Sequence, residues 1–134
     1  MQLDDMRKSY IKYRLETAKE DLDAAGLLYE NGKLRASANR SYYCIFHAMR
    51  AVLAVDNIDF KHHSAVIAYF RKEYIKTGIF DKELSRIIQT ASMVRNSSDY
   101  DDFYLIAQED ARIQYENAKV FYEAVEGYLQ TMLQ

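Results

Sequence analysis

The stretch VRNSSDYDDFY, which begins at Val94, holds the side chains whose types and spacing come closest to a catalytic site. An arginine and a small polar residue, here Arg95 and Asn96, would be typical of a nuclease if a histidine followed about one helical turn later. The sequence has three histidines, and none of them follows Arg95. The turn where a histidine would stand carries other side chains: Asp99, Tyr100 and Asp101. We interpret Arg95 first as a structural clamp that pairs with Asp99.

The other candidates for chemistry are the histidines, the single cysteine and the acidic turn. His62 and His63 are adjacent, so on a helix they point about 100° apart and cannot share a metal as an i, i+4 pair does. We expect them to bond backbone or carboxylate groups. Cys44 has no second cysteine to pair with and is expected in the core or an interface. The acidic turn lacks the glycine and the closing glutamate of a calcium loop: Asp99, Asp101 and Asp102. The sequence therefore predicts no metal site and no cofactor.

Charge is unevenly distributed along the chain, although the net charge is only −2. Residues 31–55 contain no acidic residue and four basic ones: Lys33, Arg35, Arg40 and Arg50. Acidic residues gather later in the chain: Asp99, Asp101, Asp102, Glu109 and Asp110. Two interpretations stay open. The two segments are complementary within a chain or between subunits, or the basic segment is a face that binds a polyanion.

Composition predicts one all-α domain that spans residues 1–134. The chain is 49% hydrophobic and has no proline and only 4 glycines, which favours long helices over a turn-rich β architecture. Apolar residues repeat at helical spacing over about residues 4–30, where Asn31 and Gly32 supply a stop, and again over about residues 111–132. We expect an up-and-down bundle of four to five helices. Because the chain shows no signal-peptide pattern and no membrane span, we expect a cytoplasmic protein.

The second helix, about residues 33–55, has an apolar face and a polar side. The apolar face consists of Ala38, Tyr42, Ile45, Phe46, Met49 and Leu53. On the opposite side a 100° step brings four residues into one narrow arc, which we call the polar seam: Arg40, Tyr43, His47 and Arg50. The seam has three interpretations, namely a subunit interface, a solvated surface and a ligand site.

Two shorter helices follow. The third is expected to begin after KHHS, with Ser64 as its N-cap, and to carry Val66, Ile67, Phe70 and Tyr74. The fourth is expected to begin with Asp81 as its cap. It should end near Arg95 or Asn96, because the polar residues there compete for backbone hydrogen bonds. This places Arg95 at a helix C-terminus.

The segments NRSYYCIFHAMRAVL, KHHSAV and VRNSSDYDDFY, in this order and spacing, resemble the HEPN domain family, named for higher eukaryotes and prokaryotes nucleotide-binding. The similarity is to the small stand-alone prokaryotic branch and spans nearly the whole chain. It implies a bundle of four or five helices that commonly forms a two-fold dimer and is often encoded beside a small nucleotidyltransferase. Many family members are RNA-cleaving toxins that use an arginine, a polar neighbour and a histidine four to six residues further on.

Carried over by this resemblance, Arg95 matches the arginine and Asn96 its polar neighbour, while the histidine is missing. One hypothesis is a non-catalytic helical homodimer that binds a nucleotidyltransferase or another component of a toxin–antitoxin or defence pair. The alternative is a divergent HEPN ribonuclease toxin or nucleotide-binding domain. It would use Arg95, Asn96 and Tyr100 with His63 or His47 supplied from elsewhere in the fold.

The resemblance also implies partners. RNA or a nucleotide is a candidate ligand, whereas DNA readout and membrane binding are not expected. In related pairs the partner enzyme can transfer nucleotidyl groups to a tyrosine near the motif, which makes Tyr100 and Tyr104 candidate modification sites. The alternative for both tyrosines is packing against the bundle, since most of the 12 tyrosines in so small a domain must be structural.

Overall fold

Five α-helices and one short π-helical segment make up the computed structural model, which describes residues 3–100 and 105–134, with the side chains of residues 98–100 also outside the description. The described residues contain no strand, which confirms the all-α prediction. The elements in chain order are α1 (Asp5–Glu30), α2 (Leu34–Val55), α3 (His63–Phe70), η1 (Arg71–Ile75), α4 (Glu83–Tyr100) and α5 (Gln108–Leu133). None of the helices in these ranges is long and apolar enough to cross a membrane.

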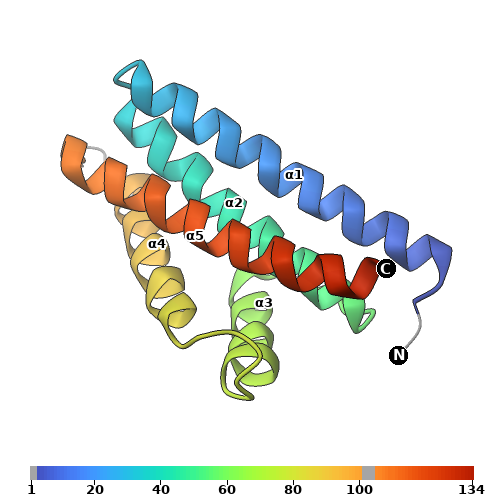
Figure 1. Ribbon diagram of the computed structural model, residues 1–134. Coiled ribbons are helices and arrows are strands. Elements are labelled where there is room, and N and C mark those ends of the chain that lie inside the picture. The colour runs from blue at the N-terminus through green and yellow to red at the C-terminus, as the bar shows by residue number, and fades with distance from the viewer. Residues whose placement is uncertain (1–2, 101–104) are drawn as a thin grey trace.

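Helix α2 is the centre of the bundle. Long helices α1 and α5 run beside it, and α3 and α4 lie below them in the view of Figure 1. α2 packs most extensively against α1, next against α5, and also against α3 and α4. Its apolar face is fully covered, as Tyr42, Phe46 and Met49 show with exposures of 3%, 5% and 0%. Removing this area from water is the main term that stabilises the bundle.

Two serines of α2 are buried and bonded to backbone carbonyls, one of α1 and one of α2 itself. The Ser37 hydroxyl donates to the Ala25 carbonyl of α1 at 2.8 Å, and the Ser41 hydroxyl donates to the Ser37 carbonyl at 3.0 Å. Both side chains are fully buried, and these hydrogen bonds offset the cost of burying the hydroxyl groups.

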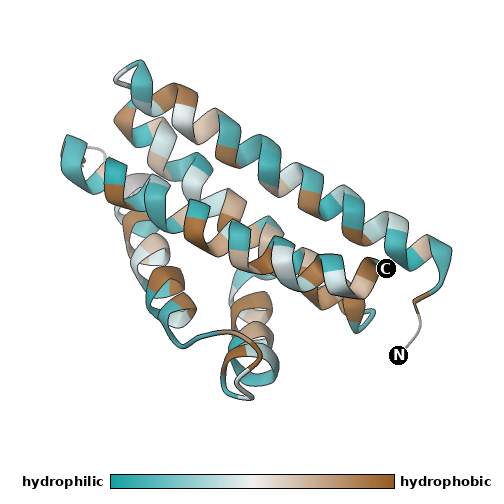
Figure 2. Ribbon diagram, viewed as in Figure 1, coloured by the Kyte–Doolittle hydropathy of each residue, from teal (hydrophilic) through white to brown (hydrophobic). Residues whose placement is uncertain are grey.

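Figure 2 shows that the helices differ in hydropathy: α1 carries many hydrophilic residues along its length, whereas α3 is largely apolar.

The ends of α1 follow the sequence prediction. Asp4 is the N-cap, and its carboxylate accepts from the Arg7 backbone N–H at 2.7 Å. At the other end the Asn31 side chain donates to the Leu27 carbonyl at 2.8 Å. Gly32 then turns the chain with a φ of +74°, a conformation that residues with a Cβ adopt only with strain. The Asn31–Gly32 stop is confirmed.

Two predicted helix ends are wrong and one is confirmed. The N-cap of α3 is His62, not Ser64, so His63 is the first residue of the helix. The Asp81 carboxylate accepts from the Glu83 backbone N–H at 2.8 Å, as expected of a cap. Helix α4 runs on to Tyr100, so Arg95 lies inside the helix and not at its C-terminus. The backbone ladder continues past Asn96 because the preference of asparagine and serine for non-helical hydrogen bonds is weak.

Candidate functional site

Arg95 of α4 lies against two tyrosines of α2. Its guanidinium carbon is 5.0 Å from the centre of the Tyr42 ring and 5.8 Å from that of Tyr43. The two rings meet edge to face, with centroids 5.4 Å apart and planes at 87°. A cation above an aromatic ring is attracted by the negative ring face, and this contact strengthens as water is excluded. The tyrosine pair therefore attracts the charge of Arg95 to the surface of α2.

His63 of α3 reaches the same pair of tyrosines. Its Nδ1 is 2.8 Å from the Tyr42 hydroxyl, and its ring stacks on Phe46 with centroids 3.9 Å apart. It also meets the Tyr43 ring edge to face at 6.0 Å. We call these five residues the Arg95–His63 cluster; they are Tyr42, Tyr43, Phe46, His63 and Arg95.

The pKa of His63 is lowered from its usual value of 6.5, first by burial and then by the charges of Arg95 and Arg50. Arg95 and His63 approach the same two tyrosines of α2. Because its pKa is lowered, the imidazole is neutral at pH 7. Where its Nδ1–H donates to the Tyr42 hydroxyl, Nε2 carries the lone pair and can accept a proton.

The polar seam is half-buried, and carboxylates within the described chain hold two of its four residues. Arg40 donates to Asp21 of α1 at 3.0 Å. Arg50 donates from both Nε and Nη2 to Asp59, which follows α2, with the shorter distance 2.8 Å. Basic residues of segment 31–55 do pair with carboxylates of the same chain, but for Arg40 and Arg50 these carboxylates are Asp21 and Asp59. Glu109, one of the acidic residues expected to complement the basic segment 31–55, is bound by Arg112 of its own helix.

His47, the third seam residue, is surrounded by cations. Burial lowers its pKa to about 4, helped by the charges of Arg50, Arg14 and Arg40 and of the more distant His63. Its Nε2 lies 3.9 Å from the Asp21 carboxylate. Since the ring is neutral at pH 7, this contact is not an ion pair there. His47 touches the Arg95–His63 cluster through the rings of Tyr43 and Phe46, at 6.1 and 5.5 Å.

The structure places the other candidates as follows. Asn96 is exposed, and Cys44 is fully buried, where burial raises the pKa of its thiol. The side chains of Asp99 and Tyr100, and all of Asp101, Asp102 and Tyr104, lie outside the described residues, so the Arg95–Asp99 clamp and both modification sites stay predictions. Among the residues that are described, no three His, Cys, Asp or Glu side chains gather as a metal site would require.

Sequence reasoning missed Tyr42 and Phe46 as parts of a site. Both were assigned to the apolar face of α2, and both are indeed buried. Both residues nevertheless contact His63, and the Tyr42 ring also contacts the guanidinium of Arg95. Residues at the edge of the core are therefore part of the cluster. A signal was present in the run Tyr42–Tyr43, which puts a hydroxyl at the border between the apolar face and the polar seam.

The fold and the cluster together define a class: a small all-α bundle in which an arginine and a neutral histidine from two helices meet on aromatic residues of a third. The family model of the HEPN domain matches residues 11–128, and the chain belongs to this family. The resemblance in the sequence is thereby confirmed.

Curated relatives agree with this assignment. A UPF0332 protein of Thermotoga maritima is 31% identical over 126 residues, which cover 94% of this chain and 96% of that protein. Two proteins of Methanocaldococcus jannaschii are named "Putative toxin MJ0142" and "Putative toxin MJ0605". They are 32% and 33% identical, over 91% and 96% of this chain and 83% and 95% of their own lengths.

Proposed function

We propose that this HEPN protein is an RNA-cleaving toxin in which His63 takes the place of the histidine missing after Arg95. The observation that carries the proposal is that Arg95 and His63, from α4 and α3, both rest on the Tyr42–Tyr43 pair of α2. The divergent-ribonuclease hypothesis required such a convergence. The names of the two Methanocaldococcus relatives support the toxin class.

The chemistry follows from the two groups. The 2′-oxygen of a ribose attacks the adjacent phosphorus, the bond from phosphorus to the 5′-oxygen breaks, and a 2′,3′-cyclic phosphate forms. Neutral His63 takes the proton of the attacking 2′-hydroxyl at Nε2, and the proton returns to the departing 5′-oxygen. Arg95 stabilises the negative charge that builds up on the phosphate oxygens. Tyr42 positions the imidazole through its hydroxyl.

The test is cleavage of a mixed RNA substrate by the purified protein without added metal, beside Arg95→Ala and Arg112→Ala variants of equal helicity. Arg112 is a matched control, because it is an arginine on the surface of α5 that pairs only with glutamates in the contacts described for it. We expect cleavage by the wild type and by Arg112→Ala, and a loss of at least about 100-fold in Arg95→Ala. Absence of cleavage by the wild-type protein would overturn the proposal.

A second candidate is the non-catalytic homodimer that binds a nucleotidyltransferase or another component of a toxin–antitoxin pair. The observation that favours it is that Asp21 and Asp59 already pair with Arg40 and Arg50, so these arginines are partly neutralised and suit a polar protein interface better than a polyanion face. This candidate predicts a dimer in light scattering and no cleavage. Arg50→Glu should then weaken the dimer or the captured partner complex, whereas Arg86→Glu, on the exposed side of α4, should not.

A further inference from the structure

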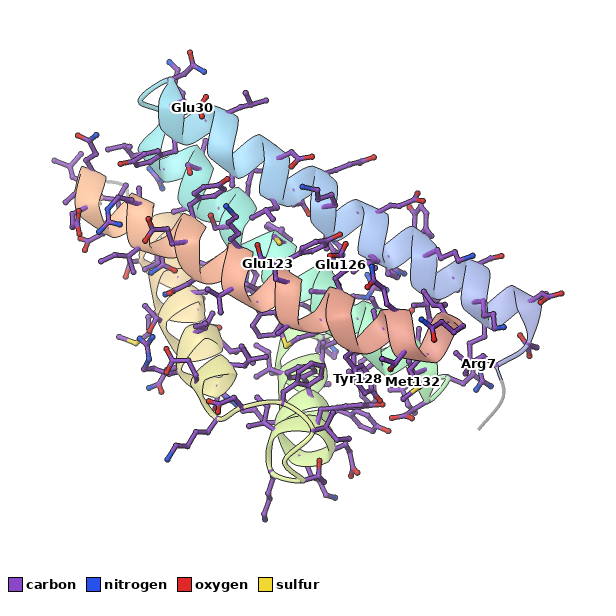
Figure 3. All side chains as sticks on the ribbon, viewed as in Figure 1. Arg7, Glu30, Glu123, Glu126, Tyr128 and Met132 are labelled. Carbon is purple, nitrogen blue, oxygen red and sulfur yellow. The ribbon has the colours of Figure 1, made fainter. Side chains whose placement is uncertain are left out.

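A pocket of about 410 Å³ opens where α1 begins and α2 ends, away from the Arg95–His63 cluster. Figure 3 labels Arg7 at this end of the bundle, close to the end of α5. Three apolar residues line the pocket, Met6, Ala54 and Ile58, together with five polar or charged ones: Asp4, Arg7, Tyr10, Asn57 and Asp59. Polar groups that can orient a ligand therefore stand beside an apolar wall that can pack against it, as a site for a small organic group requires.

Asp59, one of the polar residues that line the pocket, has its carboxylate held in a fixed orientation. Asp59 accepts from Arg50 at 2.8 Å on one oxygen and from the Tyr10 hydroxyl at 3.2 Å on the other. Arg14 lies 3.9 Å from the second oxygen. Burial alone would raise the pKa of Asp59, but the hydrogen bonds from Arg50 and Tyr10 and the charge of Arg50 bring it below its usual value. Oδ1 already accepts from both Nε and Nη2 of Arg50, whereas Oδ2 accepts only from Tyr10 among the hydrogen bonds described. Because the side chain is 48% exposed, Asp59 can accept a further hydrogen bond at Oδ2.

The pocket is connected to the cluster by direct contacts. The Arg50 that holds Asp59 also lies over the Phe46 ring, with its guanidinium carbon 5.8 Å from the ring centre. Phe46 in turn stacks on His63 at 3.9 Å. An RNA strand with a phosphate at His63 would pass Arg50, which is half-buried, before it reaches Tyr10 and Asp59.

We propose that this pocket binds a nucleobase of the RNA strand that lies in the Arg95–His63 cluster, and that it prefers guanine. The inference rests on the proposed function. Guanine presents two adjacent N–H donors, N1–H and the N2 amino group, to a carboxylate that is fixed by Arg50 and Tyr10. Uracil presents one N–H between two acceptors, which a carboxylate repels.

The charges around the pocket favour a base over a phosphate in its interior. Asp4 and Asp59 both line it, and Arg7 is the one cation among the lining residues described. The Arg7 guanidinium already donates to the Val55 carbonyl at 3.1 Å. A phosphate would meet two carboxylates here, whereas the backbone of a strand could stay outside near Arg14 and Arg50. The base would pack against the Tyr10 ring and the apolar wall.

The experiment measures binding of fluorescent 2′-O-methyl pentanucleotides UUGUU and UUUUU, in which the attacking hydroxyl is blocked. We expect the wild type to bind UUGUU about 10-fold more tightly. Asp59→Asn should remove this preference, because the amide offers one acceptor and one donor in place of two acceptors. Asp23→Asn is the matched control, since Asp23 is an exposed carboxylate of α1 paired with Lys19, and it should keep the preference. Tyr10→Ala is the second pocket variant and should weaken UUGUU binding about 10-fold.

The outcomes separate the two proposals. Equal affinity of the wild type for both oligonucleotides overturns the guanine pocket, and the proposed function survives if Arg95→Ala still weakens binding. A preference for UUGUU that persists in both Asp59→Asn and Tyr10→Ala also overturns it, because the base is then read elsewhere. If the wild type binds neither oligonucleotide, the guanine pocket falls, and the cleavage assay on mixed RNA decides the proposed function independently.

Discussion

His63 and His47 have the same chemistry but opposite surroundings. Both rings lie on α2 aromatic side chains, and burial lowers both pKa values, so both are neutral at pH 7. His63 comes from a separate helix, is bonded to the Tyr42 hydroxyl and feels the charge of Arg95. His47 lies in the polar seam among arginines and beside Asp21. The comparison teaches that a lowered pKa makes a histidine available as a base, but that the neighbouring side chains decide whether a substrate group can be placed beside it.

The largest expected effect separates the two histidines by activity. His63→Gln should lower RNA cleavage by about 100-fold or more, since it removes the proposed proton acceptor. His47→Gln should stay within a few-fold of the wild type. Single-turnover cleavage rates of both variants, with the exposed His62→Gln as control, check this. If His47→Gln is the inactive variant, the roles that we assign to the two histidines are reversed.

The second effect concerns stability against pH. The imidazole of His47 takes up a proton near pH 6.5 in the unfolded chain but only at about pH 4 in the folded chain. Stability is therefore unaffected by this group above about pH 7 and is lost as the pH falls from 6.5 to 4, by about 2 to 3 kcal/mol. Urea unfolding at pH 7 and pH 4.5 should show a smaller loss for His47→Gln than for the wild type. An identical loss in both proteins would contradict the assignment.

A third effect tests the carboxylate of α1 that pairs with the polar seam. Asp21 is 8% exposed and accepts from Arg40, but burial raises its pKa more than Arg40 lowers it, so a neutral Asn would relieve part of the cost of burying the charge. Asp21→Ala removes the acceptor altogether and should destabilise the fold by about 2 kcal/mol, because it leaves a half-buried arginine without its partner. Asp23→Ala changes an exposed carboxylate two residues away and should cost less than about 0.5 kcal/mol. Chemical denaturation at pH 7 measures both. Equal costs would mean that the Asp21–Arg40 pair is no more important than a surface pair.

The smallest expected effect tests whether the Tyr42 hydroxyl orients His63. Tyr42→Phe keeps the ring under Arg95 but removes the hydroxyl bonded to His63. The loss of one part-buried hydrogen bond should cost about 1 kcal/mol of stability. Cleavage should fall by about 10-fold, because the imidazole loses its orienting partner. Retention of full activity would show that Phe46 stacking alone positions His63.

Much of the fold could be predicted from local patterns. The apolar stripes, the Asn31–Gly32 stop and the cap at Asp81 depend on residues a few positions apart, and the structure agrees with them. The end of α4 was missed because the preference of asparagine and serine for non-helical hydrogen bonds is weak, so these residue types do not fix where a helix stops.

The candidate site was only partly predictable for a similar reason. Arg95 and His63 were named from the sequence, and His63 as a partner for Arg95 was one of two alternatives with His47. The choice between them depends on where α3 crosses α2, which is a contact between segments far apart in the chain. The pattern of a single helix carries no information on that crossing.

The central place of α2 also has a consequence for the lifetime of the site. Enclosed by four helices, α2 should have the slowest amide hydrogen exchange in the molecule, because its backbone opens only when the whole bundle unfolds. The tyrosines under the cluster belong to this slow unit, whereas Arg95 and His63 belong to α4 and α3, which pack less extensively. A partial opening of either short helix would therefore take the cluster apart while the three long helices stay folded.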